Sequence, residues 1–190
     1  MTSHADLLNN MPLLRAALIG RHKWYVHETP EGNIKKIRES GLITNSDAAP
    51  PRQVRETLRQ EQVPILCLHP LGAKLCPGGA AVTLPLRMGE DDPPRVTFAV
   101  DASDLPQRMG LDWSYEWPRQ KVELRENADL PLEAFIELAV RLVDKYGSTA
   151  AYDGIAPKML RVFCKCDPPA NPLGWSSLND AQDQNIIRHR

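Results

Sequence analysis

The stretch Tyr25-Val-His-Glu-Thr-Pro-Glu-Gly-Asn-Ile-Lys-Lys-Ile-Arg-Glu-Ser-Gly-Leu42 decides the fold of this chain. Its first residues predict a short strand that ends at His27, and residues 30–40 predict a short helix. Thr29 suits the N-cap, because a threonine hydroxyl there accepts a hydrogen bond from an otherwise unpaired amide. Gly41 is typical of the position just past a helix, where the main chain turns left-handed. The stretch therefore predicts a strand, a capped helix and a glycine stop in succession.

Outside that stretch, apolar residues at helical spacing predict a long helix over 131–145 and a first helix over 4–19 that Pro12 splits. Runs of β-branched and apolar residues predict strands at 24–27, 63–68, 80–85, 95–100, 148–152 and 159–165. Because helices cluster early and strands dominate the middle, the order favours an α+β fold with a mostly antiparallel or mixed sheet. We expect one domain over residues 1–166. The tail 167–190 holds three prolines, and we expect a surface strap or a disordered segment.

Composition excludes several classes of protein. The chain has 190 residues and a net charge of −1, so it has no global basic field for binding nucleic acid without specificity. No apolar run approaches the roughly 18 residues of a membrane span, and the first residues lack the order of a signal peptide. Four cysteines do not make a disulfide scaffold. We therefore expect a cytoplasmic protein with free thiols and no membrane partner.

The pattern His-x-Thr-x-x-x-Asn-Ile-x-x-Ile-x-x-x-Gly-Leu, from His27 to Leu42, resembles the first motif of the ADP-ribosyltransferase superfamily, particularly DarT-like and related bacterial toxin-type domains. The resemblance implies a split mixed or antiparallel sheet with flanking helices, and NAD as substrate. It implies that His27 and Thr29 line the NAD pocket. Tyr25 shares a face with His27 and either stacks on nicotinamide or packs in the core.

The resemblance also implies an arginine in the loop after this helix that meets the NAD phosphates or the reacting centre. Three arginines remain alternatives for this contact, with Arg55 as the representative choice: Arg52, Arg55 and Arg59.

Active members of this superfamily usually carry a glutamate at the start of the penultimate strand, where it stabilises the positively charged ribose as nicotinamide leaves. Here Ser148 or Thr149 occupies that position, and a hydroxyl cannot supply the negative charge. Either another carboxylate takes the role or the domain has lost the activity. The alternatives are Asp153 as the first choice, Glu116 as the second, and Asp112.

Two other groups of residues allow a functional and a structural interpretation. Asp112–Trp117 combines three aromatic residues with two carboxylates and predicts either a pocket wall or an amphipathic edge segment. The set Cys67, His69, Cys76, Cys164 and Cys166 has poor spacing for zinc. The cysteines are better explained as small buried apolar residues, and we expect no metal site and no nucleophilic cysteine.

The sequence thus predicts an NAD-dependent ADP-ribosyltransferase that cleaves the nicotinamide–ribose bond and passes ADP-ribose to a macromolecular acceptor. The acceptor is open between a protein side chain and a nucleic-acid base, with water as a further alternative. The first rival is a catalytically inactive member of the fold that acts as a binding module, which the missing glutamate favours. The second rival is an RNA 2′-phosphotransferase-like enzyme, which is disfavoured because its basic arginine and histidine motifs are not found.

Overall fold

The computed structural model describes residues 1–2, 4–44, 66–71, 74–75, 80–81, 93–112, 117–164 and 175–188. In this part of the chain, seven strands form one sheet in the order β6-β7-β2-β1-β5-β8-β9, and β3 pairs with β4 in a separate hairpin. The pairings between these strands are antiparallel, so the fold is α+β with an antiparallel sheet. The predicted fold class is confirmed.

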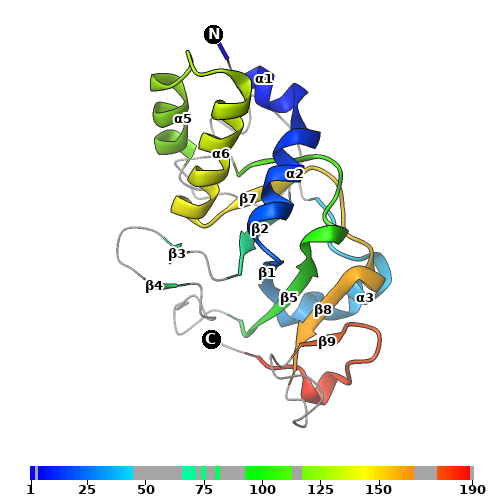
Figure 1. Cartoon of the computed structure of the whole chain (residues 1–190). Helices are drawn as coiled ribbons and strands as arrows, with labels where there is room; N and C mark the ends of the chain where they lie inside the picture. The colour runs from blue at the N-terminus through cyan, green and yellow to red at the C-terminus, as the bar shows by residue number, and fades with distance from the viewer. Residues whose placement is uncertain are drawn as a thin grey trace.

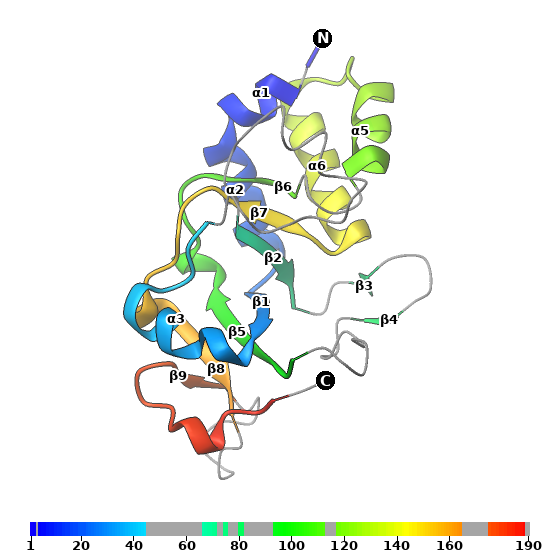
Figure 2. The same cartoon turned by 180° about the vertical axis from the view of Figure 1, so that it is seen from behind.

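The described helices are α1 (His4–Asn9), α2 (Met11–Arg21), α3 (Ile34–Ser40), α5 (Trp117–Glu126) and α6 (Leu132–Tyr146). Short 3₁₀ turns are η1 (Glu31–Asn33), η2 (Ala102–Asp104), η3 (Pro157–Met159) and η4 (Asp183–Asn185). The strands are β1 (Trp24–Pro30), β2 (Leu66–Pro70), β3 (Lys74–Leu75), β4 (Ala80–Ala81), β5 (Arg95–Asp101), β6 (Met109–Leu111), β7 (Thr149–Ala151), β8 (Leu160–Phe163) and β9 (Trp175–Ser177). Helices α1, α2, α5 and α6 gather at the end of the sheet near β6 and β7, and α3 lies at the other end beside β8 (Figures 1 and 2).

The two faces of the sheet differ in what they pack against. Alternate residues of a strand point to opposite faces. On one face, which we call the helix-side face, the strand residues join the helices in one apolar core. Its strand residues include Tyr25, Leu66, Leu68, Val96, Phe98, Met109, Leu111, Leu160 and Val162. The opposite face carries a small separate cluster around Val26, Ala99 and Trp175, to which the described helices contribute no residue.

Helix α6 confirms the strongest prediction from the sequence. Its apolar stripe is buried against the helix-side face, and Gly147 ends it in the left-handed conformation at φ 71°. The amide of Gly147 donates to the carbonyl of Val143, which pairs one of the carbonyls that a helix end leaves open. Helix α6 therefore begins and ends where its sequence pattern indicates.

The stretch from Tyr25 to Leu42 differs from the prediction in its first half. Strand β1 continues beyond His27 to Pro30, because β5 pairs with it along its whole length. Thr29 is therefore a strand residue and does not cap α3; instead its hydroxyl accepts a hydrogen bond from the Asn33 side chain at 2.8 Å. A 3₁₀ turn, η1, then precedes α3.

The glycine stop in the second half of that stretch is confirmed. Gly41 has φ 74°, and a Cβ built on it would lie 2.0 Å from the carbonyl oxygen of Ile155. Leu42 and Ile155 exchange main-chain hydrogen bonds of 3.0 and 2.8 Å. The glycine thus lets the end of α3 approach the chain after β7 at a distance that no other residue allows.

Several other boundaries need correction. The first helix is split as predicted, but the break lies at Asn10, with Pro12 in the first turn of α2. The predicted strand 63–68 is seen as β2 from Leu66 onward and continues to Pro70, whereas residues 63–65 lie outside the described part of the chain. Of the predicted strand 80–85, only Ala80–Ala81 lies within the described residues. Strand β6 and helix α5 were not predicted, because three residues of strand and a strongly polar helix give little periodic signal.

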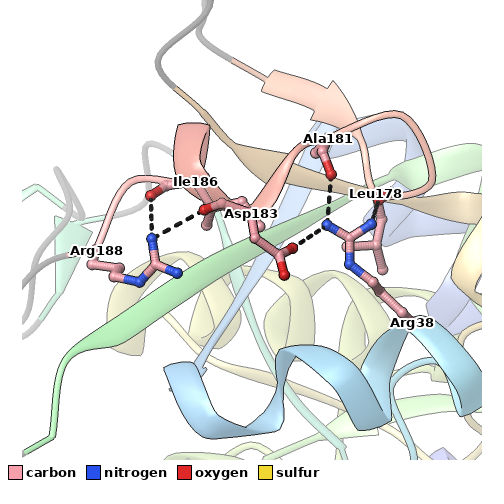
Figure 3. A network of polar contacts seen from close by, with 6 residues as sticks. All are labelled: Arg38, Leu178, Ala181, Asp183, Ile186 and Arg188. Carbon is pink, nitrogen blue, oxygen red and sulfur yellow. Dashed lines mark hydrogen bonds and ion pairs between the residues drawn. The ribbon is translucent and has the colours of Figure 1, made fainter.

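The segment 175–188 is a folded strap and not a disordered tail. Strand β9 pairs with β8, and Leu178 and Ile186 are buried in the main core. The Arg38 guanidinium of α3 donates to the carbonyls of Leu178 and Ala181, both at 2.6 Å (Figure 3). Asp183 accepts a further hydrogen bond from Arg38 at 2.7 Å. Residues 175–188 therefore pack onto the same core as the rest of the described chain.

Within the described ranges, none of the helices combines the length and apolarity that crossing a membrane requires.

Candidate functional site

Four polar side chains meet on the face opposite the helices. Cys67 and His69 lie on β2, Ser148 directly precedes β7, and Asp112 directly follows β6. The strand register explains the meeting. Leu68 lies opposite Thr149, and Thr149 lies opposite Leu111, so the next residues along, His69, Ser148 and Asp112, form one row. We call Cys67, His69, Asp112 and Ser148 the polar cluster.

Asp112 is at the centre of the polar cluster. Its side chain is fully buried, at 0 % exposure. The carboxylate oxygen Oδ2 accepts a hydrogen bond from the Cys67 thiol at 2.7 Å and another from the Ser148 hydroxyl. Cys67 Sγ and Ser148 Oγ are 3.3 Å apart, so the three side chains form a closed set. Asp112 is therefore held in place by hydrogen bonds from two neutral side chains of the cluster.

Cys67 is arranged as a proton donor and not as a nucleophile. Burial raises the pKa of the Cys67 thiol well above its ordinary value, and the charge of Asp112 and its hydrogen bond raise it further. The protonated thiol is a weak nucleophile, because the thiolate is the reactive form. Among the described residues, no group of three or more His, Cys, Asp or Glu side chains is arranged to hold a metal ion. The raised pKa of Cys67 therefore argues against a nucleophilic role for this thiol.

The two histidines of the site have defined tautomers. Nδ1 of His69 donates to the carbonyl of Gly147 at 2.7 Å, and Nδ1 of His27 donates to the carbonyl of Cys67 at 2.9 Å. A carbonyl oxygen only accepts, so Nδ1 of each ring carries the proton of that hydrogen bond. Nε2 of His69 lies 3.8 Å from Cys67 Sγ.

His27 joins β1 to the strand that carries the polar cluster. Strands β1 and β2 pair only at Tyr25–Pro70 and Val26–His69, and the His27 side chain makes the next contact between them through the Cys67 carbonyl. Burial lowers the pKa of His27 from 6.5 to about 4, with the nearby His69 and Arg95 also lowering it. The ring is therefore neutral at neutral pH.

Strand alternation places the three β1 residues predicted to bind the cofactor, Tyr25, His27 and Thr29, on the helix-side face. Tyr25 is fully buried in the main core, and its hydroxyl donates to the carbonyl of Leu18 in α2 at 3.0 Å. Burial raises the pKa of Tyr25, and Asp144 raises it further. Thr29 is buried beside Asn33. Both side chains support the strand that carries His27.

Of the three carboxylates considered from the sequence, the structure describes Asp153 and Asp112, and their surroundings differ. Asp153 forms an ion pair with Arg108 at 2.5 Å, and the two side chains are 38 % and 61 % exposed. The hydrogen bond from Arg108 lowers the pKa of Asp153. Asp112 instead lies beside Ser148, one of the two positions, with Thr149, where the resemblance predicts a glutamate. Glu116 and the loop arginine Arg55 lie outside the described residues, as do Arg52 and Arg59.

Sequence reasoning treated Cys67 and His69 as a weak metal set and ranked Asp112 last among the carboxylates. The signal that unites them is the strand register, which aligns β6, β7 and β2. A sequence pattern does not contain that register unless the strand pairing is known.

Comparison with known proteins adds no relative. No family model matches the chain, and neither a curated protein nor a solved structure matches it.

Proposed function

We propose that the protein is an NAD-dependent ADP-ribosyltransferase in which Asp112 takes the part that a glutamate at the position of Ser148 plays in the superfamily it resembles. One observation carries the proposal: the Asp112 carboxylate accepts a hydrogen bond from the Ser148 hydroxyl. A carboxylate therefore lies next to Ser148, although it comes from a different strand, and this supports the proposal. Judged by sequence position alone, the proposed site would lack this carboxylate.

The chemistry needs an anion of this kind. When the bond between ribose C1′ and the nicotinamide nitrogen breaks, nicotinamide leaves with the electron pair and the ribose becomes oxocarbenium-like. The acceptor then forms a bond to C1′ and loses its proton. A buried carboxylate stabilises the developing positive charge more strongly than an exposed one, because little water screens it. The burial of Asp112 and its two neutral donors suit this role.

His27 supplies orientation in the same proposal. Its Nδ1 is fixed by the Cys67 carbonyl, and its ring is neutral because its pKa is lowered to about 4. Nε2 is then an acceptor suited to a ribose hydroxyl. In the cytoplasm, the compartment expected from the sequence, the protein would encounter NAD. The acceptor of ADP-ribose stays open between a protein and a nucleic acid.

The test measures nicotinamide release from NAD by the full chain, with candidate protein and nucleic-acid acceptors and with water alone. We expect Asp112→Asn to lower turnover by about a hundredfold or more, with little change in the Kd of NAD, since it removes an interaction made in the transition state. Asp153→Asn is the matched control. Its carboxylate is paired with Arg108 at the surface, so turnover should stay within about twofold.

The outcomes separate the enzyme from its first rival. Loss of turnover in Asp112→Asn at unchanged NAD affinity supports the proposal, provided that the variant keeps the melting temperature of the wild type to within a few degrees. Equal loss in Asp153→Asn contradicts the assignment of Asp112. Wild-type protein that binds NAD and releases no nicotinamide with any acceptor contradicts the transferase, and leaves the non-catalytic binding module as the function.

A further inference from the structure

The hydrogen-bonded ladder between β1 and β2 stops one step short of Cys67. The amide of Leu71 donates to the carbonyl of Trp24 at 2.9 Å, which marks one hydrogen-bonded position of this antiparallel ladder. Such positions recur at every second residue, so a continued ladder would pair Glu28 with Cys67. The pairing of the two strands ends instead at Val26. The main chain of Cys67 therefore meets β1 at the point where the regular ladder has ended.

Side chains bind the two carbonyls that the missing pair would have used. Nδ1 of His27 donates to the carbonyl of Cys67 at 2.9 Å, and Nη2 of Arg95 donates to the carbonyl of Glu28 at 3.2 Å. A carbonyl inside a sheet needs a hydrogen-bond partner, and here the His27 ring supplies it in place of a β1 amide. The position of the Cys67 main chain relative to β1 thus depends on His27, and the orientation of the ring depends on Cys67.

The side chain of the same residue holds Asp112. The carbonyls of a strand lie near the plane of the sheet, whereas its side chains stand out from that plane, so one residue can contact both. The Cys67 thiol donates to Oδ2 of Asp112 at 2.7 Å, and the Ser148 hydroxyl donates to the same oxygen. Cys67 is fixed on its other side by its pairing with Ala150 of β7. Alternation places His27 on the helix-side face, and Cys67 joins it to the polar cluster on the opposite face.

The thiol differs in one respect from an apolar side chain of similar size. Alanine or valine in place of Cys67 could fill the space beside Asp112 but could not donate to its carboxylate. The carboxylate would then keep one donor of the polar cluster, Ser148. A catalytic group must be held close to its productive geometry, since misplacement by about 1 Å can lower the rate about a hundredfold. Two donors, one on β2 and one beside β7, restrict the carboxylate more than one does.

We propose that Cys67 is a positioning residue of the proposed transferase reaction. Its thiol orients the Asp112 carboxylate, its carbonyl orients the His27 ring, and it thereby fixes how these two groups lie relative to each other. The inference rests on the proposed function, because it presupposes a reaction in which Asp112 takes part. The role of Cys67 itself is argued from the end of the β1–β2 ladder and from the hydrogen bonds of its thiol and carbonyl.

The experiment measures kcat and KM of nicotinamide release from NAD by the full chain. Cys67→Ala removes the thiol and keeps the main-chain carbonyl that binds His27. We expect kcat to fall about tenfold or more and KM to stay within about twofold, since Asp112 acts in the transition state. Cys67→Val should give the same loss with the volume filled, which covers the case that a cavity unfolds Cys67→Ala. Cys67→Ser restores a donor and should recover kcat to within about threefold of the wild type.

Cys164→Ala is the matched control, because it removes a buried thiol of the main core that is not part of the polar cluster. Its kcat should stay within about twofold of that of the wild type, whatever its melting temperature.

Rescue by serine is the result that separates positioning from packing. A thiol that only fills space would be replaced better by valine than by serine, so a kcat for Cys67→Ser no higher than that for Cys67→Val overturns the proposal. Wild-type kcat in Cys67→Ala and Cys67→Val also overturns it, and turnover that still depends on Asp112 would leave the transferase standing. An equal loss of kcat in Cys164→Ala overturns it as well, because the effect would then follow from the loss of any buried thiol. Wild-type protein that releases no nicotinamide overturns the transferase, and the role of Cys67 with it.

Discussion

Thr149, the first residue of β7, and Ser148, which directly precedes it, show how the two faces of the sheet differ. Thr149 points to the helix-side face, and its hydroxyl donates to the Gly110 carbonyl of the neighbouring strand at 2.6 Å. Ser148 points to the opposite face, and its hydroxyl donates to the Asp112 carboxylate. Both residues are fully buried. One hydroxyl is used to join strands, whereas the other is used to hold a charge.

The same contrast extends across the sheet. The helix-side face packs apolar side chains of each described helix against the strands, which is the arrangement that stabilises a fold. The opposite face buries a carboxylate and an unpartnered threonine hydroxyl, each of which costs stability to bury. A protein keeps such groups where they serve a function, so this difference locates the candidate site on the face opposite the helices.

The largest effect expected is steric and concerns the helix-side face. Gly41→Val should lower the free energy of unfolding by about 3 kcal/mol or more, because φ 74° strains a β-branched residue and its Cβ would collide with the Ile155 carbonyl. Gly32→Ala is the matched control, since a Cβ there meets nothing within 4 Å. Urea unfolding measures both. Equal stability of the two variants would contradict the close contact between the end of α3 and the chain after β7.

A smaller effect is expected from His27, whose ring contacts the main chain of Cys67 on the neighbouring strand. Its pKa is lowered from 6.5 to about 4, so on acidification the unfolded chain takes up the proton first. Stability is therefore complete above pH 6.5 and falls as the pH decreases toward 4, by about 2 kcal/mol between pH 7.5 and 4.5. Urea unfolding across this range should show the loss in wild type and a correspondingly flatter profile in His27→Gln. Parallel profiles would mean that His27 is not buried as a neutral ring.

The smallest effect is a change in the reaction rate of one thiol on the polar face. Burial and the charge of Asp112 both raise the pKa of Cys67, so iodoacetamide should modify it slowly at pH 8. Asp112→Asn should speed the reaction by about three- to tenfold, because it removes the charge that opposes the thiolate. Peptide-resolved mass spectrometry follows Cys67 separately from the other cysteines.

Ser148→Ala is the control with the opposite sign. The hydrogen bond from Ser148 lowers the pKa of Cys67, so its loss should slow the modification further. Faster modification in both variants would show that greater exposure, and not the charge of Asp112, controls the thiol.

The sequence by itself determined the parts of the fold that depend on local chemistry. The apolar stripe and following glycine of α6 define that helix, and Gly41 defines the end of α3, because helical periodicity and positive φ are properties of a few neighbouring residues. Strand β5 and the turn η2 after it follow from equally local signals, with Asp101 capping the turn through the amide of Ser103. The prediction of a cap at Thr29 was wrong, because the pairing of β5 with the end of β1 keeps Thr29 in the strand.

Only the tertiary structure decided the composition of the site. Asp112 and Ser148 are 36 positions apart, Cys67 and Asp112 are 45 apart, and His27 reaches the main chain of Cys67 across 40 residues. These meetings depend on which strands pair and in which register, and a shift of one residue would turn each side chain to the other face. The sequence could therefore indicate that a carboxylate was missing from its expected position, whereas strand register placed Asp112 beside that position.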